Sequence, residues 1–375
     1  MTPFQPGWVH AEHPDTLGSP RLAWLPEAYG EDGRFRTRRL LAGAGQGYAV
    51  LAEDRWSGGD VVIKGLWWSQ SDLDDPRSVH GALGEQKKQR DQGLRAARQA
   101  AQLTQQCPVV ISVESQPSPS LLADGRHGRH GGRPGGGMPG EVPYESFVVQ
   151  QFIGHHGGVS RTHHGGVSRT LQEEIDERAA SHRRFKPDQL LDLAEQLCNT
   201  LAALHADRHN GDEHSKGWIH ADIKPENILV LGPPARYVLI DYDAAVQIGD
   251  RIRTTTRAYA PPSAEGTDEP SELAPASERF DIYMLGATLA HAAALRRLTD
   301  RQARELYAED FDVSAPARRF IAGLRYGPIL TNALTTCLSA KKFRLATVDR
   351  VRTDLARARS ATALQSALRT LGEHR

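Results

Sequence analysis

The residues whose types and spacing could do chemistry are Asp222, Lys224, Asn227 and Asp241. A carboxylate such as Asp222 can accept the proton of an attacking hydroxyl, and a lysine two residues later can hold a γ-phosphate. An amide oxygen and a second carboxylate can hold the magnesium ion that offsets phosphate charge. The four side chains therefore indicate phosphoryl transfer from a nucleotide.

The segment that carries them reads His220-Ala-Asp222-Ile-Lys224-Pro-Glu-Asn227, followed by Asp241-Tyr-Asp243. It resembles the catalytic loop and metal-binding motif of the protein kinase family, H-R-D-x-K-x-x-N and then D-F-G. The resemblance implies ATP and magnesium as cofactors and a Ser or Thr of a protein as the substrate. It implies Asp222 as the base, Lys224 as a phosphate ligand, Asn227 and Asp241 as metal ligands, and a structural role for His220.

Upstream, Asp60-Val-Val-Ile-Lys64 resembles the family's V-A-I-K strand, which makes Lys64 the expected ligand of the α- and β-phosphates. A glycine-rich run precedes it where the family's phosphate-covering loop belongs, although two family glycines fall on Ala42 and Ala44. By itself this run would read equally well as an ordinary β-hairpin turn. Its expected nucleotide contacts are Gly43, Gly45, Gln46, Gly47 and Val50.

A short apolar strand, Ser146 to Gly154, occupies the position of the family's hinge, which binds adenine through main-chain groups. The expected contacts are the carbonyl of Gln150 and the amide of Phe152, with Val149 at the back of the pocket. The competing interpretation is that the strand simply belongs to the core.

The segment from Thr254 to Ser263 resembles the end of a kinase activation segment, and Thr256 takes the place of the threonine that braces Asp222 and Lys224. Most regulated kinases carry an Arg at position 221 that reads a phosphate on this segment. The chain has Ala221, so we expect that switch to be absent.

Asp281 begins a stretch that resembles the buried helix anchoring the catalytic loop. The family's Ala-Pro-Glu motif ends in Ser263 here, and Arg344 resembles the arginine that usually pairs with the missing Glu. Glu265 is a possible substitute for that acid.

The sequence offers two candidates for the acid that pairs with Lys64. Glu85 is the first choice and Asp91 the second, both on a charged stretch predicted to be helical. Surface salt bridging is the alternative for either residue. Asp243 also departs from the family, because glycine usually follows the aromatic residue of D-F-G.

The fold predicted from the resemblance is α+β and bilobal, with an antiparallel β-sheet N-lobe and a mainly helical C-lobe that hold ATP and magnesium between them. Leucines at helical spacing predict a helix from Asp188 to His205. The expected organisation is an N-terminal extension (1–35), an N-lobe and hinge (36–154), a loop (155–187) and a C-lobe (188–375). A Gly-, Pro-, Arg- and His-rich insertion at about 117–145 is predicted to be disordered.

The loop at 155–187 contains a perfect tandem repeat, in which His155 to Thr162 is copied as His163 to Thr170. An eight-residue unit with one apolar residue cannot build a solenoid, so we interpret it as a duplication in a surface loop. Its histidine pairs could bind metal, but a solvated loop is the stronger interpretation.

The 375 residues include 46 Lys plus Arg and 46 Asp plus Glu, a balance that argues against nucleic acid or anionic lipid as the main partner. Long apolar stretches and a signal peptide are missing from the sequence, so we expect a cytoplasmic protein without a membrane partner. Three scattered cysteines favour reduced thiols, namely Cys107, Cys198 and Cys337. The sequence does not indicate the oligomeric state, the substrate or the activating signal.

Two other classes of function compete with a protein kinase. A kinase-like phosphotransferase for small molecules would share the His-x-Asp, the Asn and the later Asp, but we would not expect Lys224 or the Thr256 to Ser263 segment. A catalytically impaired nucleotide-binding scaffold is suggested by Ala42, Ala44 and Asp243. Retention of the other motif residues argues against it.

Overall fold

The computed structural model describes residues 4–11, 21–42, 47–69, 73, 76–104, 107–124, 143–153, 169–210, 213–262, 275–308, 316–339 and 347–373. The chain divides into two compact units. Unit 1 comprises Met1–Asp91 and Val109–Ile153, and unit 2 comprises Gln92–Pro108 and Gly154–Arg375. Sheets and helices are both present, so the fold class is mixed α+β.

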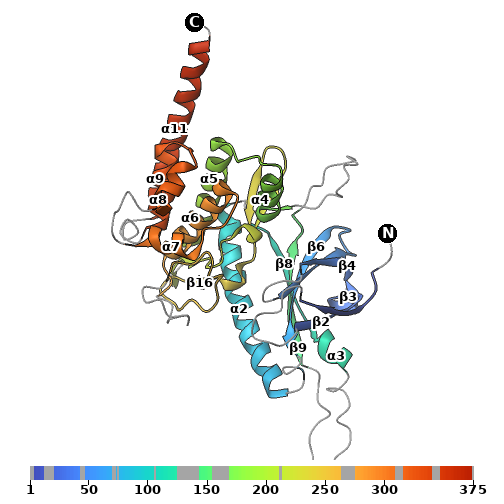
Figure 1. Cartoon of the computed structure of the whole chain (residues 1–375). Coiled ribbons are helices and arrows are strands. Elements are labelled where there is room, and N and C mark those ends of the chain that lie inside the picture. Colours follow the sequence, from blue (N-terminus) through green and yellow to red (C-terminus); the bar gives the residue numbers. More distant parts are fainter. Residues whose placement is uncertain are drawn as a thin grey trace, which may run out of the picture. The chain divides into compact units, whose positions relative to one another are not determined.

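The main feature of unit 1 is a six-stranded antiparallel sheet with the strand order β3-β4-β5-β6-β9-β8 (Figure 1). Runs of β-branched residues such as Val61 to Ile63 favour this extended conformation. The predicted strands near Lys64 and Gln150 are confirmed as β6 and β9. The bounds are β3 Ala28–Tyr29, β4 Phe35–Ala42, β5 Gly47–Asp54, β6 Asp60–Leu66, β8 Val110–Pro117 and β9 Tyr144–Gln151.

The N-terminal segment contributes to the same unit. Strands β1 (Gly7–His10), β2 (Arg21–Leu25) and β7 (Trp68–Ser69) form a second, three-stranded antiparallel sheet. The buried side chains of Ala23, Leu25 and Tyr29 join the core beneath β4, β5, β6 and β9. The described residues among the first 35 are therefore part of the folded unit and not only an addition to it.

The prediction of a disordered insertion at about 117–145 is wrong at both ends of that range. Its first residues form a short helix, α3 (Pro119–Asp124), and β9 already begins at Tyr144. Pro119, Ser120 and Leu121 are buried, and Ser120 accepts a hydrogen bond from the amide of Trp24 at 2.9 Å. This apolar and polar anchoring offsets the ordering entropy of α3. Residues 125–142 lie outside the described part.

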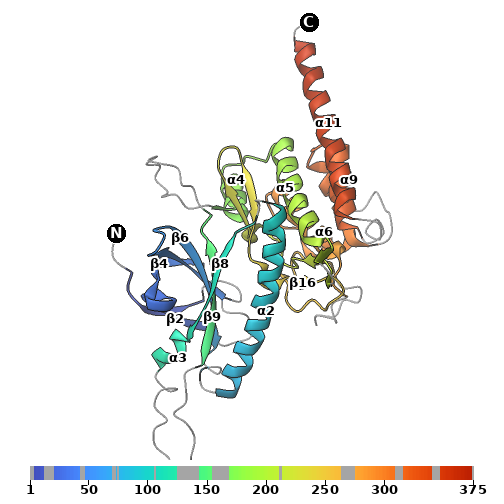
Figure 2. The same ribbon diagram turned by 180° about the vertical axis from the view of Figure 1, so that it is seen from behind.

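Unit 2 is mainly helical (Figure 2). Its central helix α6 is buried from Asp281 to Ala293, and α5 confirms the predicted helix with Leu190, Leu193, Leu197, Leu201 and Leu204 all buried. The described helices are α4 Leu171–Ala180, α5 Pro187–His205, α6 Glu278–Ala294, α7 Asp300–Tyr307, α8 Pro316–Gly323, α9 Pro328–Leu338 and α11 Val348–Glu373.

Short strands and turns of unit 2 carry the candidate catalytic residues. The described strands are β10 Arg169–Thr170, β11 Arg208–Asn210, β12 Glu213–Ser215, β13 Trp218–Ile219, β14 Ile228–Leu231, β15 Arg236–Leu239 and β16 Val246–Gln247. Strands β14 and β15 form a hairpin, and β13 pairs with β16. One-turn helices at Pro225–Asn227 and Tyr242–Ala244 include the last residues of the two sequence motifs.

The prediction of a loop through residue 187 is wrong over Leu171–Ala180, which forms α4. Thr170 caps this helix because its hydroxyl accepts from the amide of Glu173, and the Glu173 carboxylate accepts from the amide of Thr170. The pattern Thr-x-x-Glu is a capping box that can be recognised in the sequence. The described part of the repeat, Arg169 and Thr170, forms β10; residues 154–168 lie outside the described part.

Helix α2 (Pro76–Leu103) begins in unit 1, and its last turns belong to unit 2. Within unit 2 the side-chain amide of Gln99 donates to the carbonyls of Ala203, Leu204 and Ala206, at 3.2, 2.9 and 2.9 Å. The last carbonyls of a helix have no partner within it. Gln99 therefore satisfies the C-terminal end of α5.

The long helix α11 packs against α5 and α9, and both views show its C-terminal part extending beyond them (Figures 1 and 2). The guanidinium of Arg359 donates to Glu195 at 2.8 and 2.9 Å and to Asp192 at 2.7 Å. A bidentate contact of this kind fixes the orientation of a guanidinium better than a single ion pair does. Arg359 thus fastens α11 to α5.

Candidate active site

The carboxylate of Asp222 is the centre of a hydrogen-bonded cluster in unit 2. Its Oδ1 accepts from the amide and the hydroxyl of Thr256 at 3.0 and 2.7 Å. Its Oδ2 accepts from the amide nitrogen of Asn227 at 2.9 Å and lies 2.9 Å from the ammonium of Lys224. The ammonium also donates to the Thr256 hydroxyl at 2.8 Å. Residues 34 positions apart in sequence thus meet around one carboxylate.

Asp281 holds the backbone that presents Asp222. This fully buried carboxylate accepts from the amide of His220 at 2.7 Å, from the amide of Ala221 at 2.9 Å and from Nε2 of His205 at 2.9 Å. Ala221 has a left-handed conformation with φ 61°. Non-glycine residues adopt it only where surrounding contacts impose it, often at functional sites. The two bonds from Asp281 supply that constraint.

His220 is fully buried beneath the same loop. Its Nδ1 accepts from the amide of Asp222 at 3.3 Å, so the ring proton lies on Nε2, which donates to the carbonyl of Ile240 at 3.1 Å. Burial lowers the pKa of His220, and the charges of Asp281, Asp222 and Asp241 act in the opposite direction. A neutral ring with both nitrogens engaged is a link between the two motifs.

Asp241 lies at the start of the second motif in a left-handed conformation, φ 67° and ψ 70°. The following residue, Tyr242, is buried, and its ring centroid lies 4.7 Å from that of His220. Gly93 of α2 lies against the backbone of Tyr242, where a Cβ would be only 2.6 Å from the carbonyl oxygen. The conformation of Asp241 is therefore supported from the catalytic loop and from α2.

Lys64 lies on β6 of unit 1, and the strand register determines which residues share its face of the sheet. Cross-strand partners lie on one face, and Lys64 pairs with Ala49 of β5 and with Val148 of β9. Val50 pairs with Ile63, and both are fully buried in the core on the opposite face. Val50, which we predicted to contact the nucleotide, therefore lies on the face opposite Lys64, and Ala49 lies on the face of Lys64.

The predicted adenine contacts lie at the end of β9. Gln150 pairs with Val62 and is on the same face as Lys64. The amide of Phe152 donates to the carbonyl of Asp60 at 3.3 Å, so adenine could use it only in exchange for that bond. Gly47 begins β5, whereas Gly43, Gly45 and Gln46 lie outside the described part of the chain.

The two acids proposed as partners of Lys64, Glu85 and Asp91, are both exposed on α2. Asp54 and Glu145 are buried carboxylates of unit 1. Glu145 accepts from the amide of Leu66 at 3.2 Å and from the hydroxyl of Ser118 at 2.8 Å.

Burial raises the pKa of Glu145, and the nearby positive charge of Arg90 opposes that rise. Arg90 is itself 5% exposed and comes from α2. In this part of unit 1 the helix thus supplies a buried cation and the sheet a buried acid. No local sequence pattern indicates this pair, because the two residues are 55 positions apart in separate elements.

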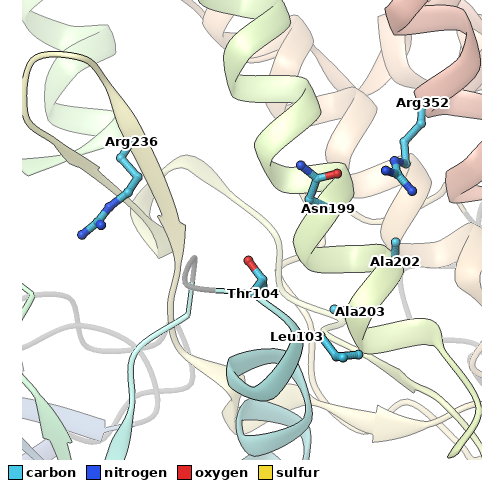
Figure 3. Close-up of a pocket in the computed structure, with 7 residues that line it drawn as sticks. All are labelled: Leu103, Thr104, Asn199, Ala202, Ala203, Arg236 and Arg352. Carbon is cyan, nitrogen blue, oxygen red and sulfur yellow. The ribbon is translucent and has the colours of Figure 1, made fainter.

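A cavity of about 620 Å³ in unit 2 is lined by other residues than those of the Asp222 cluster. Figure 3 shows that its residues come from the end of α2, from α5, from β15 and from α11. They are Leu103, Thr104, Asn199, Ala202, Ala203, Arg236 and Arg352. These seven include no predicted site residue, so the predicted chemistry does not belong to this cavity.

Comparison with known proteins bears on the kinase resemblance. No family model matches the chain. Serine/threonine-protein kinase PknD of Chlamydia muridarum is 25% identical over 279 residues, which are 68% of this chain and 24% of that protein. Serine/threonine-protein kinase YabT of Bacillus subtilis is 44% identical over 64 residues, 17% of this chain and 16% of that protein. Serine/threonine-protein kinase ArnS of Sulfolobus acidocaldarius is 29% identical over 100 residues, 23% of this chain and 16% of that protein.

The chain is therefore similar to serine/threonine-protein kinases, at 25% identity over the longest of these three matches. Its matches cover less than a quarter of the length of these relatives. Among the helices in the described ranges, none has the length and apolar character needed to cross a membrane.

Proposed function

We propose that this chain is a protein kinase that transfers the γ-phosphoryl group of ATP, with magnesium, to a Ser or Thr of a protein. The observation that carries the proposal is the arrangement of Lys224, Asn227 and Thr256 around the carboxylate of Asp222. Preorganised charges and donors of this kind lower the barrier to phosphoryl transfer, because little reorganisation is needed during the reaction.

Asp222 is the proposed base. In the structure each of its oxygens already accepts from two donors, so an incoming hydroxyl needs one of them to leave. The ammonium of Lys224 contacts the side chains of Asp222 and Thr256, and the Lys224 side chain is 21% exposed. We infer that the ammonium turns to the γ-phosphate when nucleotide binds, which frees Oδ2 to receive the hydroxyl proton.

Magnesium fits the donor set of Asn227 and Asp241. Asn227 uses its amide nitrogen for the bonds to the carboxylate and carbonyl of Asp222, so its oxygen is the atom suited to a cation. Magnesium usually binds through one or two protein oxygens together with phosphate oxygens and water. The ion, when bound, would offset the charge of the phosphates.

Lys64 is the proposed ligand of the α- and β-phosphates, and Ala49 and Gln150 on its face of the sheet are the proposed neighbours of the nucleotide. A six-stranded antiparallel sheet in one unit and a mainly helical second unit support a two-lobed kinase fold. A protein substrate is favoured because the similar proteins are named serine/threonine-protein kinases.

The test is incubation of the purified chain with γ-labelled ATP and magnesium. One reaction contains an unfolded protein rich in Ser and Thr, and a second contains a mixture of small-molecule alcohols. We expect label on Ser and Thr of the protein. Label only on the small molecules would assign a different phosphotransferase, and nucleotide binding without transfer would assign a scaffold.

A further inference from the structure

A buried hydrogen bond links α6 to the segment that braces the proposed base. The hydroxyl of Tyr259 and Nδ1 of His291 are 2.8 Å apart, and the rings are stacked with centroids 6.1 Å apart. Tyr259 is 4% exposed and His291 7%. Both polar groups are thus removed from water, where each needs a partner.

Tyr259 is joined to the Asp222 cluster through a turn. Its amide donates to the carbonyl of Thr256 at 3.0 Å, and the amide of Ala260 donates to the same carbonyl at 3.3 Å. Thr256 in turn gives its amide and its hydroxyl to Asp222. A continuous path of four residues therefore runs from His291 to the proposed base.

His291 is suited to accept a hydrogen bond from the hydroxyl of Tyr259. Burial lowers the pKa of its imidazole to about 4, with the negative charge of Asp176 raising it and the positive charge of Arg297 lowering it further. Burial also raises the pKa of the Tyr259 hydroxyl, on which the charges of Glu226, Arg297 and Asp176 act as well. At neutral pH a protonated phenol therefore donates to an uncharged imidazole.

We propose that the Tyr259–His291 hydrogen bond is a positioning contact for phosphoryl transfer, which holds the turn that begins at Thr256 in the place where Thr256 meets Asp222 and Lys224. The proposal rests on the proposed function above and adds two positioning residues to it. Neither residue is required to touch substrate. They act by fixing the donor that orients the base.

The bond matters because loss of either partner leaves the other buried without its hydrogen bond. That cost can be relieved by movement of the turn, and the movement displaces Thr256 from Asp222. A contact of this kind is worth about a factor of ten in rate.

The experiment measures kcat and KM for ATP in Tyr259→Phe, His291→Leu, His291→Asn and the double variant Tyr259→Phe with His291→Leu. We expect kcat to fall about tenfold in each of the first two and no further in the double variant, because both remove the same bond. His291→Asn keeps an acceptor in a similar place and should retain most of kcat. The KM for ATP should be unchanged throughout.

The matched control is Tyr326→Phe. Tyr326 is another buried tyrosine of unit 2, whose hydroxyl donates to the carbonyl of Phe185 at 2.9 Å and to that of Ala293 at 3.4 Å. This variant loses the same chemical group and should keep kcat. An equal loss of kcat in the control, or rate losses that multiply in the double variant, would overturn the proposal.

Hydrogen exchange in the peptide that contains Thr256 supplies a readout independent of activity. The backbone amide of Thr256 should exchange faster in Tyr259→Phe and His291→Leu than in the wild type. In His291→Asn and Tyr326→Phe it should exchange at the wild-type rate. Unchanged exchange in the first two variants contradicts the positioning role. An inactive wild-type protein with this exchange pattern would instead contradict the proposed function and leave the contact established.

Discussion

Thr256 is the residue on which the two proposed catalytic side chains converge. Its hydroxyl donates to Asp222 at 2.7 Å and accepts from Lys224 at 2.8 Å. Its neighbour Thr255 instead points its hydroxyl toward the sulfur of Met284, 4.0 Å away. Adjacent threonines therefore have different surroundings, although the sequence presents them as equivalent.

This difference leads to a prediction about the threonines. Thr256→Ala should lower kcat about tenfold or more, because the base loses a charged-group hydrogen bond, and Thr256→Ser should restore most of it. Thr254→Ala with Thr255→Ala should retain most activity, since Ala221 cannot read a phosphate on either residue. Rates of protein phosphorylation measure this. A double variant as slow as Thr256→Ala would mean that another cation, such as Arg251, Arg253 or Arg257, reads a phosphate there.

At the scale of elements, α2 contains glycines in contrasting surroundings. Gly93 lies against the backbone of Tyr242, whereas nothing lies within 4 Å of a Cβ added at Gly84. Alanine is the better helix former of the two residues by roughly 1 kcal/mol. Alanine substitution at Gly84 therefore tests helix propensity alone, whereas alanine substitution at Gly93 also tests close packing.

We predict that Gly84→Ala raises the free energy of unfolding by up to about 1 kcal/mol. Gly93→Ala should lower it by about 1–3 kcal/mol, because backbone atoms of the Tyr242 segment have to move. The same movement should weaken binding of magnesium-ATP through Asp241. Urea titrations and nucleotide titrations of both variants provide the measurements. Equal stabilisation by the two substitutions would show that α2 does not constrain the Asp241 segment.

The capped start of α4 makes the tandem repeat testable. Deletion of His163 to Thr170 leaves an identical copy before Leu171, so Thr162 would become the capping residue. The deletion should change the free energy of unfolding by less than about 1 kcal/mol, because loop-closure entropy varies slowly with length.

Thr162→Ala then serves as a sharper probe of the same element. In the full chain it should have little effect, since Thr170 is the cap there. In the deletion variant it should cost about 1 kcal/mol. Both effects are measured by thermal unfolding of the full chain and of the deletion variant, each with and without Thr162→Ala. The same cost in the two backgrounds would show that the copies are not interchangeable.

For the whole molecule, the sequence could predict the elements and motifs whose evidence is local. Strand β6 with Lys64, helix α5 and the loop around Asp222 follow from short-range patterns. The face of Val50 could not be predicted, because alternation shows that a strand has two faces but does not show which face carries Lys64. Cross-strand pairing decides this, and it depends on contacts between separate segments.

The other gaps in the prediction have similar causes. The burial of Glu145 near Arg90 and the bond from Tyr259 to His291 both join residues far apart in the chain. The start of helix α4 is marked by a local signal, its Thr-x-x-Glu capping box, although the repeat that precedes it has the composition of a loop. A single sequence identifies the reacting groups better than the residues that position them.

The measurement that tests the central claim most directly is label transfer from γ-labelled ATP by the wild type, Asp222→Asn and Asp250→Asn, with nucleotide affinity measured on the same samples. Asp250 is an exposed carboxylate outside the cluster and serves as the control. The account predicts that the wild type and Asp250→Asn label Ser and Thr of the protein acceptor, and that Asp222→Asn binds magnesium-ATP but transfers no label. Near-normal transfer by Asp222→Asn would contradict the assignment of Asp222 as the base of a protein kinase.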